Sequence, residues 1–258
     1  MPNLTDLEKL ARQAGEVLRA GYEGKHTIRY KGVIDLVTEV DSQSEALLLE
    51  AIGRDFPGHK ILSEEIGVVV GRESDAWLID PLDGTVNYAH GIPIFSVSIA
   101  YAHDGAVTLG VVYDPLRDEL FSAERGRGAW RNGQPIHAST VEELQRSLLV
   151  TGFSYDIRTS PRDNLDNYAH FSRLSQGVRR LGSAALDLCY VGCGRFDGYW
   201  ELSISPWDVA AGGLVASEAG ARVTAVDGSP DYLTPPCTLL AAPPALHARM
   251  LAVLSEAG

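Results

Sequence analysis

The chain has 258 residues, of which 45% are hydrophobic and 22% charged, and its formal net charge is −12 at pH 7. This composition suits a globular protein with a large core, and the acidic balance without a basic cluster argues against a nucleic-acid partner. The three cysteines have neither a disulfide nor a zinc-binding pattern, and no apolar run reaches the length of a membrane span. We therefore expect a cytoplasmic protein without a membrane partner.

The N-terminal part begins with two predicted helices. Residues 5–8 have the form of a capping box and precede apolar residues at helical spacing, which predicts a helix ending near Gly21. Asp41 or Ser42 is expected to cap a second helix, which stops before Pro57.

Two short apolar strands are predicted next, at residues 61–62 and 76–79, and each is followed by carboxylates. Glu64 comes after the first strand. Asp80 and Asp83 come after the second, separated by a proline that is expected to stop the strand. Since magnesium prefers oxygen ligands, these strand ends predict a magnesium site.

The residues after Asp83 predict a phosphate-binding turn. Gly84 and Thr85 could open a short helix whose unpaired N–H groups face whatever lies beside the carboxylates. Metal ligands next to a phosphate cradle are typical of a metal-dependent phosphoryl site. Asp208 offers a further carboxylate at the start of a later helix, where an ordinary N-cap is the alternative role.

Strands are predicted through residues 95–134, with a hairpin turn at Asn132-Gly133. From about residue 148 the pattern alternates between strands and helices. Strands are expected at residues 148–151, 179–181, 199–200, 221–226 and 239–242, and helices at 165–174, from 184 to about 193, at 208–218 and from 244. The chain therefore divides into an α+β half, residues 1–147, and an α/β half, residues 148–258, packed tightly as one unit with a cleft between them.

Three motifs together resemble the inositol monophosphatase family of lithium-sensitive, magnesium-dependent phosphatases. They are Ser63-Glu64-Glu65, Asp80-Pro-Leu-Asp83-Gly-Thr85-Val-Asn87-Tyr and Trp207-Asp208-Val-Ala-Ala-Gly. The likeness extends from about Leu4 to the last helix. It implies an α/β protein with a five-layer α/β/α/β/α sandwich of the inositol monophosphatase and fructose-1,6-bisphosphatase type, usually assembled as a homodimer.

The resemblance also implies roles for individual residues. The implied ligands of two or three magnesium ions are Glu64, Asp80, the Leu82 carbonyl oxygen, Asp83 and Asp208. The implied catalytic groups are Glu64, Asp41 and Thr85, with Asp41 pairing with the Thr85 hydroxyl to orient the attacking water. The implied substrate contacts are Asp83, Gly84, Thr85, Ser183, Ala184 and Glu201, of which Gly84 and Thr85 hold the phosphate through their N–H groups. Lys31 matches a mobile-loop lysine of the family only loosely.

The implied activity is that of a metal-dependent phosphoric monoester hydrolase acting on a small-molecule phosphate ester. Inositol monophosphate would be hydrolysed to inositol and phosphate by a metal-activated water, without a covalent phosphoenzyme. Glu201 favours that substrate because it can accept hydrogen bonds from hydroxyls. Fructose 1,6-bisphosphate, histidinol phosphate and phosphoadenosine phosphate are alternatives, since related enzymes share the metal motifs. Arg179 and Arg180 could serve a second phosphate, a subunit contact or neither.

Two other classes of protein are alternatives. One is a phosphatase whose strand-end aspartate becomes phosphorylated, but its Asp-x-Asp-Gly-Thr signature is one residue shorter than the motif at residues 80–85. The other is a non-catalytic regulatory or binding protein on the same fold. Against it, every expected ligand position carries an oxygen-bearing group.

Overall fold

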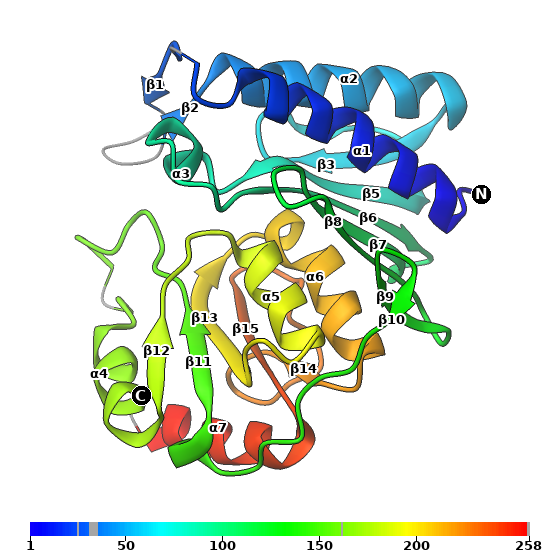
Figure 1. Cartoon of the computed structure of the whole chain (residues 1–258). Helices are drawn as coiled ribbons and strands as arrows, with labels where there is room; N and C mark the ends of the chain where they lie inside the picture. Colours follow the sequence, from blue (N-terminus) through cyan, green and yellow to red (C-terminus); the bar gives the residue numbers. More distant parts are fainter. Residues whose placement is uncertain (25, 31–35, 161, 257–258) are drawn as a thin grey trace.

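The computed structural model describes residues 1–24, 26–30, 36–160 and 162–256. Lys31, the loosely matched loop lysine, lies outside the described residues. Two β-sheets alternate with three layers of helices through the molecule (Figure 1). This arrangement confirms the predicted five-layer α/β/α/β/α sandwich.

Each helical layer is formed by a pair of helices. One outer layer contains α1 (Leu4–Gly21) and α2 (Glu39–Asp55), the middle layer α5 (Ala184–Gly192) and α6 (Pro206–Glu218), and the other outer layer α4 (Leu165–Leu174) and α7 (Pro244–Glu256). The shorter elements outside the two large sheets are α3 (Thr85–Ala89), the 3-10 helix η1 (Leu144–Arg146) and the paired strands β1 (Arg29–Tyr30) and β2 (Leu36–Val37). None of the described helices has both the length and the apolar character needed to cross a bilayer.

The first sheet has eight strands, and all neighbours are antiparallel except β3 and β5. Its spatial order is β10 (Gln134–Pro135), β9 (Gly128–Arg131), β8 (Glu119–Glu124), β7 (Ala106–Asp114), β6 (Ser96–His103), β5 (Arg72–Asp83), β3 (His59–Ser63) and β4 (Gly67–Val69). Because β3 and β5 are parallel, with Ser63 opposite Ile79, their carboxyl ends meet at one edge of the sheet. Glu64 follows Ser63 and Asp80 follows Ile79, so these two acidic residues lie next to each other at this edge of the sheet.

The second sheet has five strands and belongs to the C-terminal part of the chain. Its order is β12 (Gly177–Arg179), β11 (Leu148–Thr151), β13 (Gly198–Ile204), β15 (Cys237–Ala242) and β14 (Arg222–Thr224). The first three strands are parallel, and β15 is antiparallel to both of its neighbours. The strand predicted at residues 179–181 lies two residues earlier, because the chain leaves the sheet at residue 180 to reach α5.

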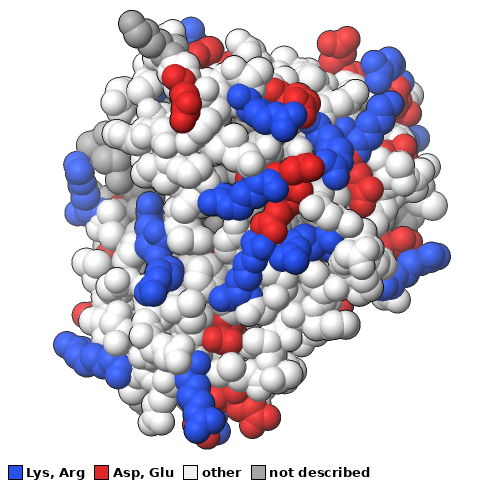
Figure 2. Space-filling view, in the orientation of Figure 1, with Lys and Arg blue, Asp and Glu red and all other residues white. Residues whose placement is uncertain are grey.

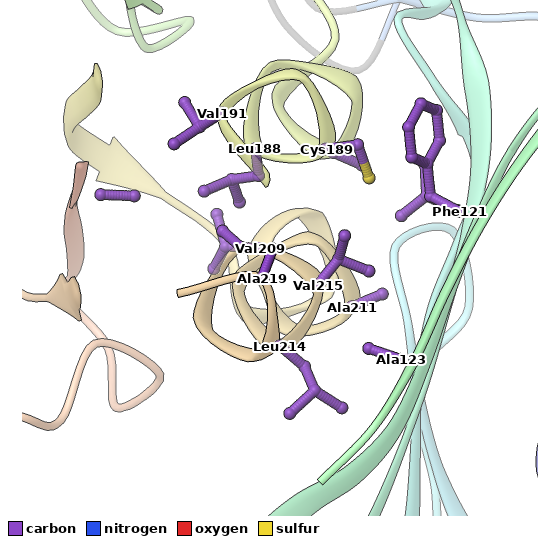
Figure 3. Packing of buried hydrophobic residues seen from close by; sticks show 14 of the residues in the cluster. Phe121, Ala123, Leu188, Cys189, Val191, Val209, Ala211, Leu214, Val215 and Ala219 are labelled. Atoms are coloured by element: carbon purple, nitrogen blue, oxygen red, sulfur yellow. The ribbon is translucent and has the colours of Figure 1, made fainter. Parts of the chain in front are cut away.

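The middle layer joins the two sheets through apolar side chains. Figure 3 shows Leu188 and Cys189 of α5 packed beside Val215 and Ala211 of α6, next to Phe121 of the eight-stranded sheet. These residues belong to one buried cluster that extends from the eight-stranded sheet to β15 of the five-stranded sheet. The close packing holds the first turns of α5 and α6 in fixed positions against the eight-stranded sheet.

Both N-terminal helices begin earlier than predicted. The cap of α1 is Asn3, whose side chain accepts a hydrogen bond from Asp6 N at 3.2 Å, so the capping box assigned to residues 5–8 was wrong. The cap of α2 is Thr38, and Asp41 is the third helical residue instead of the cap. In both cases another good capping residue stood just upstream, and the helix extended to it.

The prediction that Pro81 stops its strand was also wrong. β5 continues to Asp83, and its pairing with β6 shifts between Asp80 and Asp83. A register shift of this kind is a bulge, where a proline costs no ladder hydrogen bond. The bulge keeps Asp80, Leu82 and Asp83 on one continuous, buried segment at the edge of the sheet.

Charged side chains of both signs share the surface. On the face seen in Figure 2, acidic side chains lie among the Lys and Arg side chains. Ion pairs such as Arg12–Asp118, at 2.9 Å, and Lys60–Glu73, at 2.8 Å, join neighbouring groups of opposite sign. Acidic groups thus interrupt the basic side chains on that face.

Candidate active site

A pocket of about 460 Å³ is lined by the carboxyl end of β5, the first turns of α5 and α6, and the loop after β11. Its lining therefore comes from both parts of the chain. The volume is in the range of pockets that hold small molecules. Glu64, Asp80, Asp83 and Asp208 all contribute to its walls.

Three carboxylates converge in this pocket. Glu64, Asp80 and Asp208 each offer one oxygen atom, and these atoms all lie within 4.8 Å of one another. Asp208 is the third residue of α6, and it accepts a hydrogen bond from Ser205 N at 3.0 Å. The N-cap is therefore Ser205, and the alternative role of Asp208 as the cap was wrong. All three donors are hard oxygen atoms, which suits magnesium.

The electrostatics of the cluster favour a cation. Burial raises the pKa of Asp80 well above its ordinary 3.8, and repulsion by Glu64, Asp83 and Asp208 raises it further. Burial likewise raises the pKa of Asp208, followed by repulsion from Glu64 and Asp83. Since a divalent cation would relieve both effects, the residues present fit a magnesium ion.

These pKa shifts predict pH-dependent stabilisation by magnesium. Carboxyls with raised pKa values bind protons more tightly in the folded protein than in the unfolded chain, so the metal-free fold loses stability as the pH rises above 3.8 and through about 6, the pKa of Asp83. A magnesium ion bound to these carboxylates would counteract that loss. We expect calorimetry to show a larger magnesium-induced rise in Tm at about pH 8 than at about pH 5. Equal rises at both pH values would contradict this reading.

Asp83 lies beside the three-carboxylate group but is not part of it. Its carboxylate accepts hydrogen bonds from Ser183 Oγ at 2.5 Å, Ala185 N at 2.9 Å and Ala184 N at 3.2 Å. It therefore caps the N-terminus of α5 from a strand in the other half of the chain. Burial outweighs these bonds and raises its pKa to about 6. Two of the predicted substrate contacts, Ser183 and Ala184, thus contact Asp83 in this structure.

The turn after Asp83 opens α3. Thr85 Oγ1 lies 3.0 Å from both Asp41 Oδ1 and the Leu82 carbonyl oxygen. The other carboxyl oxygen of Asp41 accepts bonds from the amide and the hydroxyl of Thr38. The structure thus places Asp41, Leu82 and Thr85 in one hydrogen-bonded group, and Leu82 and Thr85 line the pocket.

Gly84 precedes α3 with φ of 97°, a conformation that L side chains rarely adopt. A Cβ here would lie 3.0 Å from the Ile94 carbonyl oxygen and 3.2 Å from that of Gly182. We expect Gly84→Ala to lower the free energy of unfolding by about 1–3 kcal/mol and to reduce turnover at least tenfold, because the strained turn moves the N–H groups of α3. Denaturant unfolding would measure the stability and steady-state kinetics the turnover. A variant with the stability and the turnover of wild type would refute the prediction.

Glu201 lies on β13 and is only 7% exposed. It accepts a hydrogen bond from the Tyr199 hydroxyl, and burial raises its pKa to about 7. A Cβ on Gly152 would lie 2.1 Å from Glu201 Oε2, so a side chain at position 152 would displace this carboxyl. Arg180 lines the same pocket, whereas Arg179 lies on β12 and is not part of the lining.

Comparison with known proteins settles the family. A profile described as "Inositol monophosphatase family" matches residues 3–258. The chain belongs to this family. It is 48% identical over 235 residues to the "Inositol-1-monophosphatase" of Synechocystis, covering 88% of this chain and 82% of that protein. It is 40% identical over 235 residues to the "Nus factor SuhB" of Escherichia coli, covering 90% and 88% of the two chains.

A solved structure supports the same assignment. The inositol monophosphatase of Anabaena (Nostoc) superimposes with a TM-score of 0.90 at 46% identity, covering 99% of this chain and 96% of that one. The inositol monophosphatase fold is thus shown for nearly all of the chain.

Two parts of this inositol monophosphatase-family pocket were not anticipated. Residues 152–156 line it because they follow β11, which is parallel to the strand carrying Glu201. The carboxyl ends of parallel strands meet at one edge, and that rule could have identified the loop. Asp187 also lines the pocket. The sequence signal that could have identified Asp187 is an acidic residue inside an otherwise apolar helix.

Proposed function

We propose that this chain is a magnesium-dependent phosphomonoesterase that hydrolyses inositol monophosphate to inositol and phosphate. The observation that supports it best is the convergence of Glu64, Asp80 and Asp208, from three separate segments, within 4.8 Å in a pocket that also contains the start of α3. Carboxylates beside free helical N–H groups suit a substrate with a phosphate group bound through cations.

Each oxygen ligand has a defined source in this proposal. Glu64, Asp80 and Asp208 hold the first ion, and the Leu82 carbonyl oxygen and Asp83 extend the ligand set to two or three ions. When bound, magnesium supplies charge neutralisation for the phosphate and lowers the pKa of a bound water towards neutrality. The N–H groups of Gly84 and Thr85 bind the phosphate oxygens.

Asp41 and Thr85 orient the attacking water. The Thr85 hydroxyl donates its proton to Asp41, so its lone pairs are free to accept a hydrogen bond from water. Asp41 is only 1% exposed and is held by Thr38, which fixes its position. Glu64, at the end of β3, accepts a proton from the same water as it attacks.

Glu201 binds the alcohol part of the substrate, with Ser183 and Ala184 nearby. Its carboxyl accepts hydrogen bonds from hydroxyls, which favours inositol monophosphate. The name of the Synechocystis relative points to the same substrate. Fructose 1,6-bisphosphate and phosphoadenosine phosphate are alternative substrates. Arg180 lines the pocket, and its guanidinium could pair with their second phosphate. Histidinol phosphate is the fourth candidate.

A second candidate function is a non-catalytic binding role, which the name "Nus factor" of the Escherichia coli relative favours. Phosphate release from the four candidate substrates, with magnesium and with a chelator, separates the two. We expect magnesium-dependent release, highest with inositol-1-phosphate. Release from none of them would refute the enzymatic proposal, and a higher kcat/KM for another substrate would refute inositol monophosphate.

The assembly is part of the same proposal. We infer a homodimer from the family resemblance, and light scattering coupled to size-exclusion chromatography would measure its mass. A mass near 27.8 kDa, that of one chain, would refute the dimer.

A further inference from the structure

The first turn of α5 carries a carboxyl that the proposed reaction does not use. Asp187 is 2% exposed and lines the pocket together with Glu201. Its Oδ1 atom is buried and has no hydrogen-bond partner among the described residues. Leaving a buried polar atom unpaired destabilises a folded protein, and such atoms are uncommon. An unpaired carboxyl oxygen on a residue that lines a pocket therefore points to a ligand.

The usual structural roles of an acidic residue in a first helical turn do not account for Asp187. The N-terminal N–H groups of α5 at Ala184 and Ala185 already bond to Asp83. The Asp187 amide donates to the Ser183 carbonyl oxygen, as in any helix. Within the described part of the chain, Asp187 forms no ion pair within 4.0 Å. Neither capping nor a salt bridge holds this carboxyl in place.

The surroundings of Asp187 are those of a hydroxyl-binding site. Burial raises its pKa well above 3.8, the charges of Asp83 and Glu201 raise it further, and Arg180 lowers it. A hydroxyl suits the carboxyl in either protonation state, because a hydroxyl both donates and accepts hydrogen bonds. A second phosphate would instead meet two carboxyls close together.

We propose that Asp187 binds a hydroxyl of the polyol part of the substrate, beside the hydroxyls bound by Glu201, and is a specificity-determining residue. The inference rests on the proposed function of the pocket. An ester of an alcohol without further hydroxyls leaves Oδ1 unpaired, whereas a polyol ester satisfies it. Sites built to bond a hydroxyl discriminate against analogues that lack it.

The test compares inositol-1-phosphate with p-nitrophenyl phosphate, whose alcohol part has no free hydroxyl. In Asp187→Leu the ratio of their kcat/KM values should fall at least about tenfold, whereas Asp187→Asn, whose amide still bonds to a hydroxyl, should stay within about threefold of wild type. Asp187→Ala is the second variant if leucine prevents folding. Asn167→Leu is the matched control, because Asn167 is also buried with an unpaired Oδ1 but lies outside the pocket.

An equal change in kcat/KM for both esters, or no change in either, would overturn the role of Asp187. Failure of the proposed function looks different, because wild-type protein would then not hydrolyse inositol-1-phosphate at all. In that case, equilibrium dialysis with labelled myo-inositol decides. Weaker binding by Asp187→Leu than by wild type supports the proposal, and equal binding or no binding to wild type overturns it.

Discussion

Replacing Asp80 with asparagine is expected to lower kcat/KM for inositol-1-phosphate by about 10³-fold, which corresponds to about 4 kcal/mol of lost transition-state stabilisation. The buried carboxylate of Asp80 belongs to the three-carboxylate group that could hold a metal ion, and it is repelled by Glu64, Asp83 and Asp208. The same substitution removes the repulsion that Asp80 exerts on its neighbours. The metal-free variant should therefore unfold at a Tm no lower than that of wild type.

Asp75→Asn is the matched control, because Asp75 lies on the same strand at its far end from the pocket. Its carboxylate accepts hydrogen bonds from Tyr101 at 2.6 Å and Ser74 at 2.9 Å, which hold its pKa below the ordinary range. We expect the opposite pattern, with activity kept and Tm lowered. If Asp80→Asn kept its activity or destabilised the metal-free protein as Asp75→Asn does, Asp80 would be a structural residue.

Asp83→Asn is expected to reduce turnover at least about a hundredfold, while the protein still folds. The loss of turnover has a physical source in the structure. The carboxylate accepts bonds from Ser183, Ala184 and Ala185, and an amide has only one oxygen with which to accept them. The substitution also removes a negative charge next to the three-carboxylate group.

Ser96→Ala provides a graded control for Asp83. Ser96 Oγ donates to Asp83 Oδ2 at 3.3 Å, so the alanine variant removes one long hydrogen bond and keeps the charge. We expect it to retain most of the turnover. Kinetics and denaturant unfolding of the two variants side by side would measure the difference. Retention of most activity by Asp83→Asn would count heavily against the assignment of the site.

The strands and helices of the C-terminal half followed closely from local pattern. The helix predicted at residues 165–174 matches α4, and the strand predicted at 148–151 matches β11. The spatial order of the strands could not be predicted from local pattern, because periodicity does not specify which strands pair. The five-layer arrangement came from the family motifs instead.

The errors in the two N-terminal helix caps came from competition between neighbouring residues. Asp41 could serve as a cap by its type, but Thr38 stands three positions earlier and took that place. Asp41 then became free to bond Thr85, which lies 44 positions away in the sequence. Local pattern therefore missed the pairing of Asp41 with Thr85, and only the family resemblance implied it.

The site itself depends on contacts that no sequence window contains. Asp83 and Ala185 are 102 positions apart, yet they form the bond that caps α5. Family resemblance named Asp83 as a metal ligand without revealing this second role. The helix that carries Asp187 was predicted from the sequence. The unpaired oxygen of Asp187 can be recognised only when the neighbouring residues in space are known.

Glu64, Asp80 and Asp208 are expected to hold divalent cations together. Crystals soaked in manganese, a substitute for magnesium, would test it through the anomalous signal of the metal. We predict a peak within about 2.5 Å of a carboxylate oxygen of each of the three residues, and loss of that peak in Asp80→Asn. A peak elsewhere, or no peak in this pocket at saturating manganese, would contradict the account.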